Sequence, residues 1–169
     1  TAMIRNQVVL SDNTLRAPWR PVGAEAFFPS SGSTWFWPTG AVVSDRRPGE
    51  DIVHVALART TRNGGQELGS SSIDFEQIGV DIAEVNVPHG GSPTLIAIRP
   101  LISFTDREVN GHDIAWGAAM TIQGDDVVIY GSRSSGVPLE FGKAVYVART
   151  KVQQLSDFAG WTFWNGQGR

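Results

Sequence analysis

The sequence predicts an all-β fold made of four-stranded antiparallel sheets that follow one another like the blades of a propeller. Three observations support this class. The 169-residue chain is interrupted throughout by 19 glycines and 9 prolines. Between these breaks lie short runs of β-branched and aromatic residues, and hardly any segment has the apolar spacing of an amphipathic helix. The order of strands and turns also repeats once along the chain, which is typical of repeat architectures such as propellers.

The composition is that of a globular domain, and it excludes several classes of function. Hydrophobic residues make up 41% of the chain, which is enough for a core, and charged residues 18%. The 14 basic and 17 acidic residues give a net charge of −3 without a basic cluster, so we expect no nucleic-acid partner. The absence of cysteine excludes disulfides and thiolate metal sites. No apolar run approaches the roughly 18–20 residues of a membrane span, so no span is expected.

The first repeat unit begins with a tryptophan and a run of small residues. Its expected elements are a strand at 37–43, a polar turn at 44–50, a strand at 51–59, a Gly/Ser-rich loop at 60–72, and strands at 79–87 and 94–99. Residues 52–58 and 94–98 are apolar at nearly every position, which predicts strands covered on both faces. A simple two-sheet sandwich, the alternative, would show cleaner alternation of apolar and polar residues.

The second repeat unit has the same order of elements. We expect a strand at 116–121, a turn at 123–126, a strand at 127–133, a loop at 134–142, a strand at 143–150 and a final strand at 160–164. Only residues 152–158 have a helical turn as their expected structure, inside a connection. Trp37 corresponds to Trp116 and Arg59 to Arg133. The small residues that open each unit suit an innermost strand, where neighbouring blades converge.

Two blades cannot close a ring, because propellers need about four blades or more. We therefore expect the chain to be a section of a longer protein, or to be completed by blades from another chain. The expected boundaries are residues 1–20 for the end of a preceding blade, with a leading strand at 3–12, and then residues 21–100 and 101–169 for the two blades.

Eight short motifs, in this order and spacing, resemble a known family. They are residues 3–6 (MIRN), 27–29 (FFP), 35–40 (WFWPTG), 74–83 (DFEQIGVDIA), 116–119 (WGAA), 128–133 (VIYGSR), 145–149 (VYVAR) and 161–166 (WTFWNG). The family is a group of five-bladed β-propellers, common in actinobacteria and long described as a domain of unknown function. It includes endo-D-arabinanases, glycoside hydrolases that cut the D-arabinan of mycobacterial cell-wall polysaccharides.

This resemblance implies a function and a location. It implies a section of a five-bladed propeller that acts as a glycoside hydrolase on arabinofuranose-type linkages of a bacterial cell wall, in a secreted or cell-envelope protein. The polysaccharide or an oligosaccharide would be the partner. Family members carry a Gly-Asp-Thr-type segment in the first blade, which this sequence lacks. If an essential carboxylate lies on that blade, as in related glycosidases, part of the catalytic apparatus is missing from this chain.

Glycoside cleavage normally needs two carboxyl groups that flank the scissile bond. Asp113 is the main catalytic candidate, because it precedes an innermost strand by three residues, with His112 beside it as a substrate-binding candidate. The alternative is an aspartate that forms a turn in the segment 110–113 (NGHD). Glu25 and Asp74 are weaker candidates for a carboxylate that faces the cavity.

Five further residues are candidates for binding a sugar. Trp37 and Trp116 could stack on a furanose ring or pack between blades. Arg5 and Asn6 could hydrogen-bond sugar hydroxyls or form a structural ion pair, since a guanidinium presents a planar fork of donors. Arg133 could bind substrate or form an ion pair between blades, and both roles stay open here.

The sequence shows no pattern of metal ligands or cofactor binding. The three histidines lie far apart without ligand spacing, so we expect no metal, and no phosphate loop or dinucleotide fingerprint points to a cofactor. Two other functions remain open. The first is a non-catalytic carbohydrate-binding propeller, and the second is a structural or interaction domain whose exposed blade edges recruit a partner.

Overall fold

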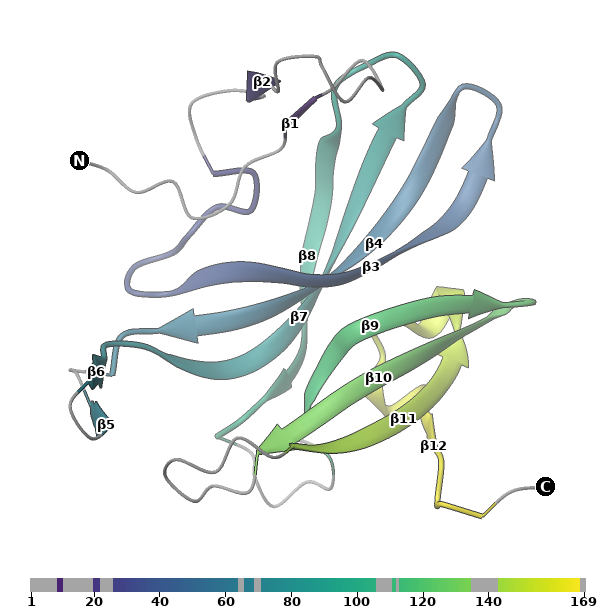
Figure 1. Cartoon of the computed structure of the whole chain (residues 1–169). Coiled ribbons are helices and arrows are strands. Elements are labelled where there is room, and N and C mark those ends of the chain that lie inside the picture. Colours follow the sequence, from purple (N-terminus) through teal and green to yellow (C-terminus); the bar gives the residue numbers. More distant parts are fainter. Residues whose placement is uncertain are drawn as a thin grey trace.

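The structure is a computed structural model of the whole chain. It describes residues 9–10, 20–21, 26–63, 66–68, 71–105, 111, 113–134 and 143–167. Two four-stranded antiparallel sheets dominate it, and they lie against each other like neighbouring blades (Figure 1). This confirms the predicted all-β class and the four-stranded antiparallel blades. The sheets of the described residues do not close into a ring.

The first sheet has the strand order β3-β4-β7-β8. Its strands are β3 (Trp35–Arg47), β4 (Glu50–Thr61), β7 (Glu76–Pro88) and β8 (Thr94–Ser103). The polar turn predicted at 44–50 is wrong in its extent, because Ser44 to Arg47 continue strand β3. Ser44 Oγ donates a hydrogen bond of 3.0 Å to the carbonyl of Ile52 on β4, and this keeps the polar segment paired.

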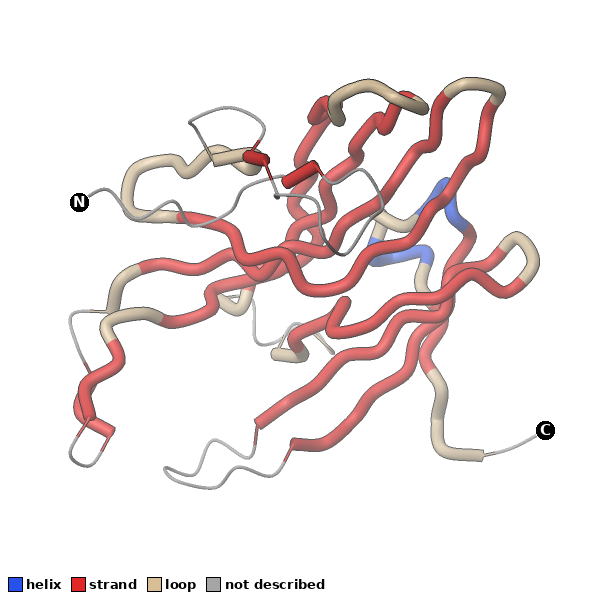
Figure 2. Tube along the Cα trace, turned by 45° about the horizontal axis from the view of Figure 1, so that its top comes forward, coloured by secondary structure: helices blue, strands red, loops and turns tan. Residues whose placement is uncertain are grey.

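The second sheet has the strand order β12-β11-β10-β9. Its strands are β9 (Ala115–Gln123), β10 (Asp126–Ser134), β11 (Lys143–Lys151) and β12 (Thr162–Phe163). Two 3-10 turns, η1 (Val152–Gln154) and η2 (Phe158–Gly160), lie in the connection from β11 to β12 and are blue in Figure 2. η1 lies within the segment 152–158, where the sequence predicts a helical turn, and η2 begins at the last residue of that segment.

Four shorter strands form two small ribbons outside these sheets. β1 (Val9–Leu10) pairs with β2 (Arg20–Pro21), and β5 (Gln66–Leu68) pairs with β6 (Ser71–Ile73) in the segment predicted as a loop. Of the leading strand predicted at 3–12, only Val9 and Leu10 are described, and the rest lies outside the described residues. The described part of the chain contains no helical stretch with the length and hydropathy of a transmembrane span.

The two sheets meet where strands β3 and β9 run close together (Figure 1). Gly40 and Gly117 lie at this contact: a Cβ atom added to Gly40 would be 2.6 Å from the carbonyl oxygen of Gly117. One added to Gly117 would overlap with the Cβ of Ala56. The small residues at the start of each repeat unit therefore permit the close approach of two strands, as the sequence predicts for the innermost strands.

Each face of the first sheet carries an apolar cluster. The face toward the second sheet joins the main core, which contains Val42, Ala56, Val80, Ile82, Leu101, Ile102, Ile114, Trp116, Val127, Ile129, Ala148, Leu155 and Trp161. On the opposite face, Phe28 packs with Leu57, Ala83 and Val85. This explains why β4 and β7 are apolar on both faces, since a strand in the middle of a covered sheet has no solvent side.

The registers of the two sheets show which residues correspond. In the first sheet, the pairing register of β3 with β4 is regular from Trp35 to the pair Pro38–Leu57 and then shifts at a β-bulge. In the second sheet, the register of β9 with β10 shifts directly beyond the pair Trp116–Gly131. These two pairs therefore occupy equivalent positions. Trp116 therefore corresponds to Pro38. The predicted correspondence of Trp37 with Trp116 is wrong by one position, which puts the two tryptophans on different faces of their sheets. The correspondence of Arg59 with Arg133 is confirmed, since each lies two residues beyond the pair at the bulge.

Candidate functional site

Two of the predicted site residues form an ion pair at one end of the second sheet. Asp113 lies just before β9, and Arg133 lies near the end of the antiparallel neighbour β10. Arg133 Nη1 donates to Asp113 Oδ2 over 3.0 Å, and the two side chains are 48% and 42% exposed. This hydrogen bond raises the pKa of Arg133. A carboxylate and a guanidinium are thus held together where a ligand can reach both.

Tyr146 of β11 completes this group, which we call the Asp113 site (Asp113, Arg133 and Tyr146). The central guanidinium carbon of Arg133 lies 5.2 Å from the centre of the Tyr146 ring. This is a cation–π distance, and the stacking fixes the plane of the guanidinium while Asp113 binds its edge. The predicted neighbour His112 lies outside the described residues.

Trp116 is a core residue in this structure. It is 2% exposed, and its indole N–H donates a hydrogen bond of 3.0 Å to the carbonyl of Gly111. Its ring contacts the rings of Tyr146, Phe158, Trp161 and Phe163 at centroid distances between 5.6 and 6.5 Å. Of the two roles that the sequence leaves open for this tryptophan, packing between the sheets is the one that its surroundings match.

Trp37 has different surroundings, because it is 38% exposed near the start of β3. Its ring meets the ring of Phe75 edge to face at 4.7 Å, and Phe75 is 39% exposed. Trp35, at 6.3 Å from Trp37, is buried beneath them. We call the exposed rings the Trp37–Phe75 pair. Accessible aromatic faces of this kind can stack on a sugar ring.

Polar groups border the Trp37–Phe75 pair. Asp74, a weaker carboxylate candidate in the sequence, forms an ion pair with Arg62, which follows β4. Asn63 donates its side-chain amide to the carbonyl of Phe75 over 3.3 Å. Sequence reasoning missed Phe75, Arg62 and Asn63 as site candidates. The only signal was the motif 74–83, which contains Phe75.

The first sheet also contains a buried ion pair, between Arg59 of β4 and Asp81 of β7. The Asp81 side chain is only 5% exposed, and burial raises the pKa of Asp81 to about 6, although the neighbouring Arg59 acts in the opposite direction. Arg59 Nη2 also donates to the carbonyl of Ile102 over 3.0 Å. These contacts lock the guanidinium within the sheet, so Arg59 has a structural role here.

Three other predicted residues cannot be placed in the structure. Arg5, Asn6 and the weaker candidate Glu25 lie outside the described residues. Within the described ranges, no group of three His, Asp or Glu side chains is arranged to hold a metal ion.

The two placed groups lie at corresponding ends of their sheets. The Trp37–Phe75 pair lies where β3 and β7 begin, and the Asp113 site where β9 begins and β10 ends (Figure 1). Because the two sheets follow the same strand order, their equivalent ends present aromatic rings on one sheet and a carboxylate with a guanidinium on the other. This combination suits a polyhydroxylated ligand.

Comparison with known proteins places the chain in a family. No curated protein and no solved structure matches it. One family model, described as a domain of unknown function (DUF5005), matches residues 1–168. This confirms the part of the sequence resemblance that predicted a domain family of unknown function. Since the match spans nearly all of the 169 residues, the chain belongs to the DUF5005 family.

Proposed function

We propose that this protein is a carbohydrate-active β-propeller and that it hydrolyses arabinofuranose-type linkages of a bacterial cell-wall polysaccharide. The observation that carries the proposal is the Asp113 site, which combines an accessible carboxylate with an arginine fixed by stacking. The exposed Trp37–Phe75 pair, at the equivalent end of the other sheet, supplies rings on which a sugar can stack. The resemblance of the eight motifs to a family that includes endo-D-arabinanases supplies the substrate class.

The chemistry assigns different tasks to these groups. Glycoside hydrolysis places one carboxyl group on each side of the scissile bond, about 5–5.5 Å apart for retention and about 6.5–9.5 Å for inversion. Asp113 supplies one of them, and Arg133 orients it. The second comes from a neighbouring blade. A secreted or cell-envelope location follows from such a substrate and is part of the proposal.

The experiment compares two aspartate variants on D-arabinan, each with the neighbouring blade present. Asp113→Asn removes the carboxylate but keeps the shape, and Asp125→Asn changes an exposed aspartate in the β9–β10 turn as a matched control. Release of reducing ends should fall by a factor of 10³ or more in the first variant, on the order expected when an essential acid or base is lost, and stay unchanged in the second. Equal activity of both variants would contradict the role of Asp113. Binding of D-arabinan without cleavage by the wild type would favour a non-catalytic carbohydrate-binding propeller.

A second function, as an interaction domain, is favoured by the outer face of the second sheet. Val80 of the first sheet is 1% exposed because the second sheet covers it, whereas its counterpart Val145 is 69% exposed. Likewise Ala56 is fully buried, and its counterpart Tyr130 is 38% exposed. We propose that a further blade, from the parent protein or from another chain, covers this face as the second sheet covers the first.

Charge introduced on this face tests the interaction. Val145→Glu should reduce assembly with the further blade, measured by sedimentation velocity, because a buried carboxylate without a partner is costly. Ile96→Glu, at a position of β8 that is 51% exposed, is the matched control and should leave assembly unchanged. If neither variant alters the sedimentation of the protein, the outer face has no such partner.

A further inference from the structure

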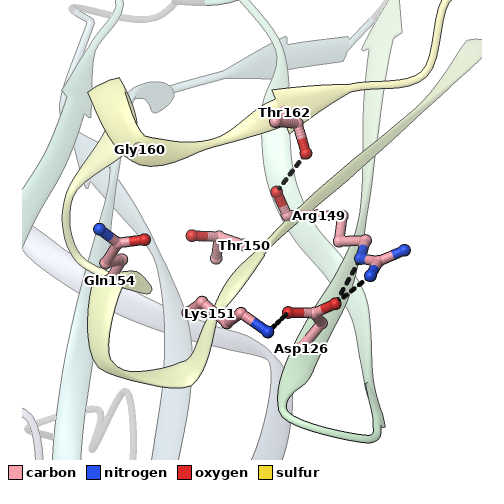
Figure 3. A pocket seen from close by; sticks show the side chains of 7 residues that line it. All are labelled: Asp126, Arg149, Thr150, Lys151, Gln154, Gly160 and Thr162. Atoms are coloured by element: carbon pink, nitrogen blue, oxygen red, sulfur yellow. Dashed lines mark hydrogen bonds and ion pairs between the residues drawn. The ribbon is translucent and has the colours of Figure 1, made fainter.

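A polar pocket lies beside the outer edge of the second sheet, away from the Asp113 site. The pocket has a volume of about 450 Å³, and Figure 3 shows the side chains that line it. They are Asp126, Arg149, Thr150, Lys151, Gln154, Gly160 and Thr162. No aliphatic or aromatic side chain belongs to this set. The charged, amide and hydroxyl groups of this lining can recognise an occupant through charge and hydrogen bonds, beside the carbon atoms of the same side chains.

The chain forms this pocket by leaving the sheet and returning to it. After Lys151 it passes through η1 and η2 before β12 resumes the sheet, and β12 pairs only with Ala148 and Arg149. The end of β11 beyond Arg149 therefore borders the pocket. Thr162 Oγ1 donates a hydrogen bond of 3.0 Å to the carbonyl of Arg149, and this bond lies at the end of the pairing between β11 and β12.

The charges in the pocket sum to an excess of one positive charge. Asp126 is the only acidic side chain in the lining, and it is 8% exposed. Arg149 binds it through Nε at 2.5 Å and through Nη2, and Lys151 binds its other oxygen at 2.8 Å. The Lys151 hydrogen bond and, after it, Arg149 lower the pKa of Asp126. Asp126 thus stays ionised and holds both cations at the pocket, while each cation keeps further N–H groups for a ligand.

Thr150 provides an independent indication of a ligand. The residue is 4% exposed, its hydroxyl has no hydrogen-bond partner among the residues that the structure describes, and in Figure 3 this hydroxyl points toward Gln154. Burying a hydroxyl without a partner costs more free energy than a typical hydrogen bond contributes to stability. Such groups are therefore rare in folded proteins and call for an explanation. A bound molecule that accepts a hydrogen bond from Thr150 would supply the missing partner once the Gln154 side chain beside it turned aside, because the hydroxyl oxygen itself is buried.

We infer that this pocket binds a small oxyanion, such as the phosphate, sulfate or carboxylate group of a molecule the size of a monosaccharide. The donors of Lys151, Arg149, Gln154 and Thr150 outnumber the acceptors, and the net charge is positive. Both properties favour an anionic oxygen ligand over a neutral one. The pocket volume exceeds that of a bare oxyanion, which leaves room for the organic part. The inference does not depend on the proposed hydrolysis.

The chain contains only two lysines, Lys143 and Lys151, at opposite ends of β11, and this permits a sharp test. Protein labelled with ¹³C at lysine gives one set of side-chain signals for each of them. In a titration with inorganic phosphate, at constant ionic strength set by chloride, the Lys151 signals should shift to saturation while the Lys143 signals stay in place. If the signals of Lys151 and Lys143 shifted equally and without saturation, the inference would be overturned. Such a result would mean that phosphate acts on both lysines only as a non-specific counterion.

Further probes distinguish the source of the oxyanion. Sulfate, acetate and ribose 5-phosphate are titrated in the same way, with ribose as the neutral counterpart of the phosphate ester. We expect ribose 5-phosphate to bind more tightly than inorganic phosphate, and ribose to leave Lys151 unchanged. A shift of Lys151 by ribose as large as that by ribose 5-phosphate would contradict an oxyanion site, because the pocket would then recognise a neutral sugar.

Variants complete the test, with binding followed on the phosphorus signal of the ligand. Lys151→Gln and Thr150→Val should each weaken binding about tenfold, the effect of losing one hydrogen bond to a charged group. Lys143→Gln removes the same charge at the other end of β11 and should bind like the wild type. Retention of phosphate binding in both Lys151→Gln and Thr150→Val would overturn the inference. Circular dichroism spectra of Thr150→Val and Lys151→Gln that match the wild type show that these variants are folded.

Discussion

Arg59 and Arg133 occupy equivalent positions in the two sheets, and each contacts a residue of the third strand. The contacted residue is Asp81 in the first sheet and Tyr146 in the second, and these two residues are also at equivalent positions. In the first sheet this contact is a buried ion pair. In the second it is a cation–π contact in a half-exposed place, which leaves the edge of the guanidinium for Asp113. One repeated arginine thus forms a structural contact inside the first sheet and organises the candidate site of the second.

The Asp81 carboxyl should make stability depend on pH. Its pKa is about 6 in the folded state and near the ordinary 3.8 when unfolded, so the folded protein binds the proton more tightly. Tighter proton binding by the folded state stabilises the protein. This contribution to stability is complete below pH 3.8 and is lost as the pH rises through 6, which lowers the free energy of unfolding by an amount on the order of 3 kcal/mol.

Asp81→Asn should abolish this dependence. The difference in free energy of unfolding between wild type and variant, measured by urea unfolding from pH 4 to pH 7, should change across this range. A constant difference over the whole range would show that Asp81 does not titrate there.

Gly117→Ala should be strongly destabilising. Gly117 has φ of 84° and an added Cβ would overlap with the Cβ of Ala56 on β4, so the substitution combines backbone strain with overpacking between β9 and the first sheet. Together these cost about 2–5 kcal/mol. Gly124→Ala is the matched control, because Gly124 has φ of 63° in a turn with open space around it. Urea unfolding of both variants checks this, and equal losses would mean that the sheets do not pack this closely.

Thr150→Val should stabilise the protein in the absence of ligand. The hydroxyl is buried without a partner, so replacing it with a methyl group of similar shape should raise the free energy of unfolding by about 1 kcal/mol. Thermal unfolding in phosphate-free buffer measures the change. A lower melting temperature for the variant would indicate that the hydroxyl already has a partner.

Trp37→Ala should weaken binding of arabinofuranose oligosaccharides by tenfold or more, since stacking on an exposed ring would be lost. Trp164→Ala is the control, because Trp164 is 62% exposed and lies at the end of the second sheet's last strand. Calorimetric titration of both variants gives the two affinities. The Trp37–Phe75 pair would have no part in binding if both tryptophans proved dispensable.

The sequence was informative about strands and less so about their register. The β-branched runs and small residues were enough to predict two four-stranded blades and the close approach of their first strands. The correspondence of Trp37 with Trp116 failed because it matched residue types, whereas the register places Pro38 at the position of Trp116. The extension of β3 through Ser44 was missed because a polar run in a strand looks like a turn.

The candidate site was predicted in part, for a similar reason. Asp113 and Arg133 were each singled out, but their contact depends on the pairing of β9 with β10. Phe75 and Arg62 belong to segments that meet only once β4 and β7 pair, so neither could be assigned to a site in advance. The pocket at Thr150 depends on the path of the β11–β12 connection, which has no pattern of its own.

The most direct test of the proposed function is the digestion of D-arabinan by the protein together with the neighbouring blade that supplies the second carboxyl group, with mass spectrometry of the products. The proposal predicts internal cleavage into short oligosaccharides from D-arabinan and no products from an α-glucan of similar length. An intact D-arabinan after prolonged incubation, together with no measurable binding, would contradict the assignment to arabinofuranose chemistry.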